Sequence, residues 1–490
     1  MNRISPLVAL AAVLPAATPA LAQIQSARPE AAGHWRALTE LDLEAAYALV
    51  NDNHPAAAPE LGDSEFRAKL AEAIAAARSR AAKVDSYGGY AAVLNGFAVA
   101  LGDQHLWSRQ AVRPAAYWWT GLSIARRGDG WAVADDARQG QAALVGARLV
   151  SCDGHPADAI AEERLGAFRG VWTMEAQRVQ TAPWLLVDDG NPFTPRPGTC
   201  VFDLDGKRST VELAWTPISA TRLAPHITKA VNVGAAGFGL RRFGGGYWIA
   251  LESLDGRARE VVDAVKAQAA EMRAAPMVVL DLRGNGGGSS SFGDEIAAAL
   301  LGQDYVRRAS PGSGAGDCPD LWRATPGNRD GLGRFVREHG PRLDADSRAF
   351  WEGALRELTE AVDAGRPFSA PVSACAGVEE AEPTPDDIGT SAFKGRLVLL
   401  TDAECFSSCL LVTRQFRALG ALHVGATTDG GNRYMEVREA LLPSGLSYAS
   451  TLQKVSPGSP RRIGPFAPSR VFQGSMADTA ALESWIAEMR

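Results

Sequence analysis

A short apolar run followed by a change of period is the most informative stretch of the chain. Residues 396–401 are almost wholly apolar, which is typical of a buried parallel strand. From Cys409 to Leu419 apolar residues recur at helical spacing, and Gly420 follows where a helix C-cap belongs. Ser407 therefore lies at a predicted strand-to-helix turn, where its hydroxyl is exposed and free helix N–H groups can stabilise an oxyanion.

This serine has a second interpretation. Ser407 and Ser408 also suit a simple capping role at the start of the helix, and caps are far commoner than nucleophiles. A hydroxyl at such a turn is, however, the geometry of the nucleophile elbow of serine hydrolases. The remainder of the chain has to decide between the two.

A second strand–turn–helix unit precedes the first. Residues 247–251 predict a strand, 258–274 a helix, 277–282 a buried strand and 292–301 another helix. The glycine-rich turn between the last two could cradle a phosphate, but it has neither the P-loop ending nor a dinucleotide-binding pattern. Its alternative use is one half of an oxyanion hole, because glycines let the backbone approach a substrate carbonyl.

The N-terminal third has a different pattern. Residues 38–102 read as helices, one of them capped by Ser64 and the last ending at Gly102. The polar loop 103–107 follows directly, and such loops carry function more often than cores do. His105 in this loop is a candidate general base, although a structural histidine would satisfy the same pattern.

Short alternating runs replace the helices from residue 116 to about 220, including a hairpin around Asp205-Gly206. Residues 144–156 resemble the stretch of PDZ domains that carries the rhythm G-x-x-L-x-x-x-x-G-x-P. The resemblance implies that an extended peptide can add here as a strand. A small β domain without a ligand is the alternative.

About ninety residues, 302–392, separate the two strand–turn–helix units, which is too long for an ordinary crossover. Residues 351–362 form an amphipathic helical pattern between Pro- and Gly-rich runs. We interpret the segment as an inserted cap over the site, with a disordered insertion as the alternative. Residues 475–490 predict a closing helix.

Composition and charge limit the classes of protein to which the chain can belong. The chain has 46% hydrophobic residues and a formal net charge of −6, which suits a globular protein and argues against a nucleic-acid partner. Residues 1–22 read as a secretory signal, and no later run is long and apolar enough for a membrane helix. We therefore expect an exported protein, periplasmic or secreted.

Six cysteines in an exported chain predict disulfides, although the sequence leaves about 15 full pairings open. We expect Cys405 and Cys409 to clamp the Ser407 turn. Cys318 and Cys375 would staple the insertion, and Cys152 and Cys200 could pair across neighbouring strands. None of the cysteines has the spacing of a zinc site, so no metal is expected.

Three runs of letters carry a family resemblance: VVLDLRGNGGG, then VLLTDAECFSSCLLV, then HVGATTDGG. Together they resemble the tail-specific, or C-terminal processing, serine peptidases. The Asp-x-His loop is similar to the tricorn-like branch of that family. Over most of the chain the resemblance implies a crotonase-like α/β core with no cofactor. It further implies that Ser407 is the nucleophile, His105 the base, and the N–H groups of Ser408 and of Gly286 or Gly287 the oxyanion hole.

The chain departs from the better-known Ser–Lys branch. The glycine turn 428–432 has no lysine, and the first lysine after Ser407 is Lys454, so a Ser–Lys dyad is excluded on residue type. His54 and His423 compete with His105 for the role of base. Glu436 is the candidate that orients the imidazole.

The sequence thus predicts a signal (1–22), a helical domain (23–115), a PDZ-like domain (116–220) and an α/β core (221–490). We expect a serine peptidase that cleaves peptides or protein tails through an acyl-enzyme, with activity rising between about pH 6 and 7. One alternative is an inactive peptide-binding or scaffold protein. The other is a crotonase-like enzyme acting on a thioester, against which the signal argues because coenzyme A is cytoplasmic.

Overall fold

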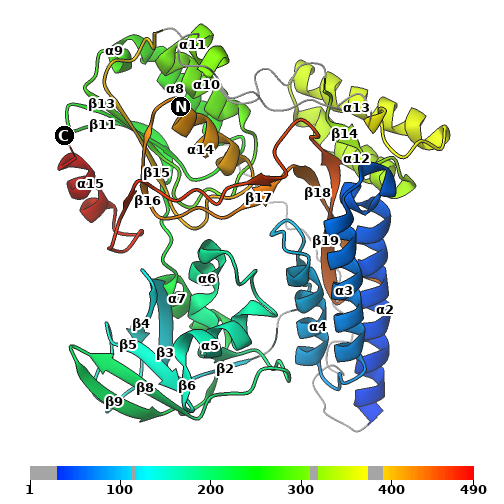
Figure 1. The fold of residues 1–490 in the computed structure, drawn as a ribbon, viewed down its shortest axis with the longest axis vertical. Coiled ribbons are helices and arrows are strands. Elements are labelled where there is room, and N and C mark those ends of the chain that lie inside the picture. Colours follow the sequence, from blue (N-terminus) through cyan, green and yellow to red (C-terminus); the bar gives the residue numbers. More distant parts are fainter. Residues whose placement is uncertain (1–29, 113, 115, 310–317, 373–389, 490) are drawn as a thin grey trace, which may run out of the picture.

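The structure is a computed structural model that describes residues 30–112, 114, 116–309, 318–372 and 390–489. The predicted signal 1–22 and Cys375, the predicted partner of Cys318, lie outside these residues. Three parts are visible: a group of long helices, a β-rich part and an α/β core (Figure 1). Within the described residues, no helix has the length and apolar character needed to span a membrane.

The N-terminal helices are α2 (Glu30–Asn53), α3 (Ser64–Ala81) and α4 (Tyr87–Ala100), which lie side by side (Figure 1). Asp63, rather than the predicted Ser64, caps α3, because its carboxylate accepts a hydrogen bond from the N–H of Phe66. The apolar faces of these helices pack against strand β19 (Ser447–Val455) near the other end of the chain. The helical part therefore shares its core with the C-terminal segment.

Strand β19 is the centre of a small antiparallel sheet. It pairs with β18 (Tyr434–Leu441) along one edge, and with β1 (Ser108–Gln110) and β14 (Leu321–Trp322). In the β1 pairing, Ser108 lies opposite Ala449. This register ties the loop 103–107 to the C-terminal half of the chain.

The β-rich part contains a sheet in the order β3 (Leu122–Arg127), β4 (Gly130–Asp136), β5 (Arg148–Cys152), β8 (Thr199–Leu204) and β9 (Lys207–Glu212). The predicted hairpin is present, since β8 and β9 are joined at Asp205 and Gly206, both with positive φ. Cys152 and Cys200 face each other on β5 and β8 and form a disulfide, as the sequence suggested.

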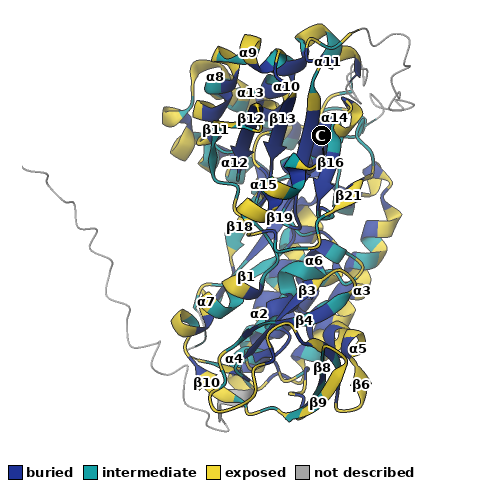
Figure 2. Cartoon of the chain, turned by 90° about the vertical axis from the view of Figure 1, so that its left-hand side faces the viewer, coloured by how far each residue is buried: buried dark blue, intermediate teal, exposed yellow. Residues whose placement is uncertain are grey.

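The α/β core is a twisted sheet in the order β11 (Phe238–Phe243), β12 (Gly246–Leu251), β13 (Met277–Asp281), β15 (Arg396–Thr401), β16 (Leu422–Gly425) and β21 (Arg470–Val471). All neighbours are parallel except β11 and β12. Strands buried on both faces explain the continuous apolar runs in the sequence (Figure 2).

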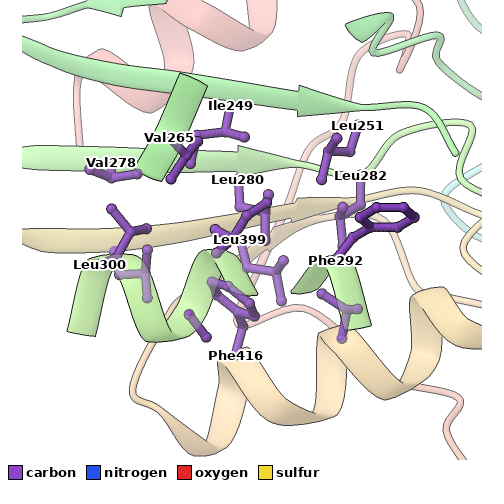
Figure 3. Packing of buried hydrophobic residues seen from close by; sticks show 14 of the residues in the cluster. Ile249, Leu251, Val265, Val278, Leu280, Leu282, Phe292, Leu300, Leu399 and Phe416 are labelled. Atoms are coloured by element: carbon purple, nitrogen blue, oxygen red, sulfur yellow. The ribbon is translucent and has the colours of Figure 1, made fainter. Parts of the chain in front are cut away.

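Alternate residues of these strands enter two cores. Ile249, Leu280 and Leu399 pack against helices α8 (Ala258–Ala267), α10 (Ser291–Leu301) and α14 (Ser408–Ala418) (Figure 3). Trp248, Val279 and Val398 point to the opposite face, where helix α15 (Thr479–Ala487) covers them. The sheet is thus held rigidly, with the carboxyl ends of β13 and β15 side by side.

The described part of the insertion contains α12 (Pro326–His339) and α13 (Ala345–Asp363). Thr325 and Asn328 form hydrogen bonds with Asn53 at the end of α2, and Arg323 bonds with β19. These contacts place this part of the insertion beside α2 and β19. That it caps the catalytic site stays a prediction.

Candidate active site

The turn that carries Ser407 has an unusual backbone. Ser407 directly precedes α14 and adopts φ 55° and ψ −126°, a region that residues with a side chain rarely occupy. Such a conformation costs of order 1–3 kcal/mol and persists only where the surroundings enforce it. Although Ser407 stands at the N-cap position of α14, its side chain makes no capping hydrogen bond and instead contacts His105, so the simple capping interpretation is wrong for this residue.

Three contacts hold the turn. Cys405 and Cys409 form the predicted disulfide, with 5.3 Å between their Cα atoms. The N–H of Phe406 donates to the carbonyl of Asn285 in the glycine-rich turn. Gly287 lies so close that a Cβ on it would be 2.7 Å from Ser407 Cβ, which explains the need for glycine there. The nucleophile turn and the glycine-rich turn therefore form one unit.

The loop 103–107 brings a histidine to this serine. Nε2 of His105 lies 3.0 Å from Oγ of Ser407, although 302 positions separate the two residues in the chain. Ser450 of β19 fixes the loop, since its hydroxyl donates to the carbonyl of His105 and accepts from the N–H of Trp107. The ring of Phe406 covers one side of the imidazole, with centroids 4.3 Å apart.

Asp103 contacts the second ring nitrogen of His105. Its Oδ1 lies 2.9 Å from Nδ1 of His105 and also accepts the backbone N–H of that residue. Its Oδ2 accepts a hydrogen bond of 2.6 Å from the amide of Asn432. Although burial by itself would raise it, these contacts lower the pKa of Asp103 to about 2, so the group is a carboxylate at neutral pH.

The prediction that Glu436 orients the imidazole is therefore corrected. Among the described residues it is Asp103 whose carboxylate contacts His105. The Glu436 carboxylate lies on β18, 3.8 Å from Nζ of Lys454, and burial raises its pKa. The Asp-x-His spacing was the available signal for Asp103. Asn432 had no such signal in the sequence, because its contact with Asp103 forms only when the glycine turn 428–432 packs against the loop 103–107.

The two competing histidines are engaged elsewhere. His54 stacks on Phe66, its Nδ1 accepts the N–H of Ala56, and burial lowers its pKa to about 4. His423 lies between Thr401 and Arg417, and burial lowers its pKa to about 4 as well. Neither contacts Ser407 among the described residues.

The backbone N–H groups predicted to form the oxyanion hole differ in whether they already have a hydrogen-bond acceptor. The N–H of Gly287 donates to the side chain of Asn285, so it is already used. In the described part of the chain, the N–H groups of Gly286 and Ser408 have no acceptor. The hydroxyl of Ser408 donates to the carbonyl of Gly288, which leaves only its backbone N–H to act at the site.

A Ser–His–Asp arrangement of this kind can activate a hydroxyl for attack on a carbonyl. Residues 246–464 match the sequence profile of peptidase family S41. This segment of the chain is similar to the S41 peptidases. It contains the glycine-rich turn and Ser407, whereas His105 and Asp103 come from the helical part before it.

The chain as a whole is similar in fold to solved structures. Mature CPAF has 12% sequence identity and a TM-score of 0.58, covering 93% of this chain and 97% of its own. Mature CPAF complexed with lactacystin has 14% identity and the same TM-score, covering 93% and 98%. The tricorn protease matches at 11% identity and a TM-score of 0.34, covering 93% of this chain and 37% of its own, which is too distant to support an argument. Among curated proteins none matches the sequence significantly.

Ser407→Ala should abolish labelling by a fluorophosphonate probe, because Ser407 Oγ is the hydroxyl that contacts His105. Ser408→Ala should keep most of the labelling, since its N–H is unchanged. Intact-protein mass spectrometry measures both. Labelling that persists in Ser407→Ala would contradict the assignment.

Replacing both Cys405 and Cys409 by alanine should lower the labelling rate by about tenfold or more, because the strained turn loses a constraint. The loop is too short for a large entropic effect on the unfolded chain. The matched control removes Cys152 and Cys200, a disulfide far from the turn. Equal losses in both variants would show that only general stability had changed.

Asp103→Asn should reduce turnover by about 10³- to 10⁴-fold, because an amide cannot hold the imidazole in the required tautomer. The folded pKa of about 2 lies below that of a free aspartate, about 3.9. The carboxylate therefore stabilises the fold above about pH 4, and this contribution is lost as the pH falls towards 2. The difference in unfolding midpoint between wild type and Asp103→Asn should shrink over that range. A difference in unfolding midpoint that stays constant between about pH 4 and 2 would contradict the stabilising role of the Asp103 carboxylate.

Proposed function

We propose that the protein is an exported serine peptidase that cleaves peptides or protein tails through an acyl-enzyme on Ser407. The observation that carries the proposal is the continuous contact from Asp103 through His105 to Ser407, with distances of 2.9 and 3.0 Å. The similarity of residues 246–464 to peptidase family S41 supports peptide bonds as the target.

The first step is attack by Ser407 Oγ on the scissile carbonyl carbon, while Nε2 of His105 accepts the hydroxyl proton. Asp103 remains a carboxylate and stabilises the imidazolium that forms. As the tetrahedral intermediate collapses, the imidazolium returns the proton to the leaving amine and the C–N bond breaks. Water then attacks the ester while His105 takes one of its protons. The imidazolium returns this proton to Ser407 Oγ as the acyl C–O bond breaks, and the carboxylic acid product leaves.

The negative oxygen of the intermediate needs hydrogen-bond donors. We assign this role to the N–H groups of Gly286 and Ser408, which lie on the two adjoining turns and are unused within the described residues. Losing one such donor typically costs 10²- to 10³-fold in rate. Gly287 acts differently, by allowing the glycine-rich turn to approach Ser407.

The β-rich part is assigned to substrate binding. Residues 144–156, which resemble a PDZ stretch, form β5 and the short strand β6 (His155–Pro156) of an antiparallel sheet, in which β5 lies between β4 and β8. Because β5 is paired on both sides, the expectation that a peptide adds at residues 144–156 is wrong, and an extended peptide would have to add at an edge strand, β3 or β9. A crotonase-like description of the core and export through residues 1–22 belong to the same proposal.

Purified protein should hydrolyse an unstructured polypeptide such as reduced casein, and His105→Ala should lose most of that rate while keeping its unfolding transition. Cleavage is followed by mass spectrometry, with Ser407→Ala as the blank. His423→Ala is the control histidine, because it lies apart from Ser407. Equal cleavage by wild type and His105→Ala would contradict the role of His105 as the base. No cleavage and no serine labelling at all would favour the inactive scaffold.

A further inference from the structure

Helix α6 (Glu175–Thr181) of the β-rich part lies against the catalytic loops. Its side chains Gln177 and Gln180 are three positions apart and so project from the same face of the helix. The amide nitrogen of Gln180 donates to the carbonyl of Ala403 at 2.6 Å, and its oxygen accepts from the amide of Gln104 at 2.9 Å. One side chain therefore bridges the turn before Ser407 and the loop of His105.

Gln177 makes a second anchor for the same helix. Its amide nitrogen lies 3.3 Å from each carboxylate oxygen of Asp429, and its oxygen accepts the N–H of Val171. The N–H of Asp429 in turn donates to the carbonyl of Cys405. The loop 103–107, the turn before Ser407 and the glycine turn 428–432 are thus all joined to α6 by hydrogen bonds, and both glutamines are at least half buried.

We infer that Gln180 is a positioning residue, through which the β-rich part sets the distance between His105 and Ser407. The inference rests on the proposed function. Gln104 directly precedes His105, and Ala403 lies four positions before Ser407. A bond to each of them restrains both partners of the proton transfer, without Gln180 touching the substrate.

This placement has a physical consequence. His105 and Ser407 belong to separate parts of the fold, so small relative shifts alter the separation of Nε2 and Oγ. Displacement by about 1 Å can cost on the order of 100-fold in rate. The β-rich part would then act on the chemical step as well as on substrate binding.

A double-mutant cycle tests this inference, using Gln104→Ala, Gln180→Ala and the double variant. The readouts are kcat and KM for peptide hydrolysis, and the rate at which a fluorophosphonate labels Ser407. Each single variant should lower kcat and the labelling rate by about 10- to 100-fold, with KM changed by less than about threefold. The double variant should lose no more than the worse single variant, because both remove the same bridge.

Two further variants separate positioning from general stability. Gln180→Glu keeps an acceptor for Gln104 but has no donor for the carbonyl of Ala403 at neutral pH, so it should lose about as much as Gln180→Ala. Thr181→Val is the matched control on the same helix, since it removes only a bond within α6. It should stay within about twofold of wild type, and all variants should keep their unfolding transition.

Losses that multiply in the double variant, or a change confined to KM, would overturn the inference. Wild-type rates in Gln180→Ala would do the same. If wild type labels at Ser407 but does not cleave peptides, the proposed function fails, and the inference is still decided by the labelling rates of the cycle.

Discussion

The site depends on the pairing of β1 with β19, which joins two strands that lie more than 300 positions apart in the chain. The loop with Asp103 and His105 lies directly before β1, and β19 lies after Ser407 in the sequence. Burial of the helical part against β19 stabilises this long-range closure through a shared apolar core. Without it, His105 would belong to a separate bundle with no access to the nucleophile.

Strain at Ser407 is the second feature that the fold has to sustain. The turn has a positive φ, and its surroundings offset that cost with a disulfide, a bond from Phe406 to the glycine-rich turn, and the close packing of Gly287. The rigid parallel sheet below places the ends of β13 and β15 next to each other, so the two turns meet without further adjustment.

Much of this could be predicted from local patterns. The apolar runs located β13 and β15, the change of period located α14, and the glycine-rich letters located the turn beside Ser407. The Cys405–Cys409 pair was expected from its spacing, whereas Cys152–Cys200, 48 positions apart, was one of the pairings that the sequence left open. The other features depend on residues near one another in sequence.

The contacts that the prediction missed are one local pair, Asp103 with His105, and several contacts between distant segments. Asp103 takes the place assigned to Glu436, because the loop turns its carboxylate onto the imidazole. Asn432 and Gln180 reach the same loop from the C-terminal half and from the β-rich part. Neither residue belongs to a motif, and only the packing of the parts against each other brings them to the site.

The most direct test of the account is the fate of Ser407 in the first turnover. An activated peptide ester is mixed with the protein, the reaction is stopped in acid within milliseconds to seconds, and the peptide that contains Ser407 is analysed by mass spectrometry. The account predicts a burst of leaving group close to one equivalent per chain, with the acyl mass on Ser407. Turnover with no acyl group on Ser407, or with the acyl group on another residue, would contradict it.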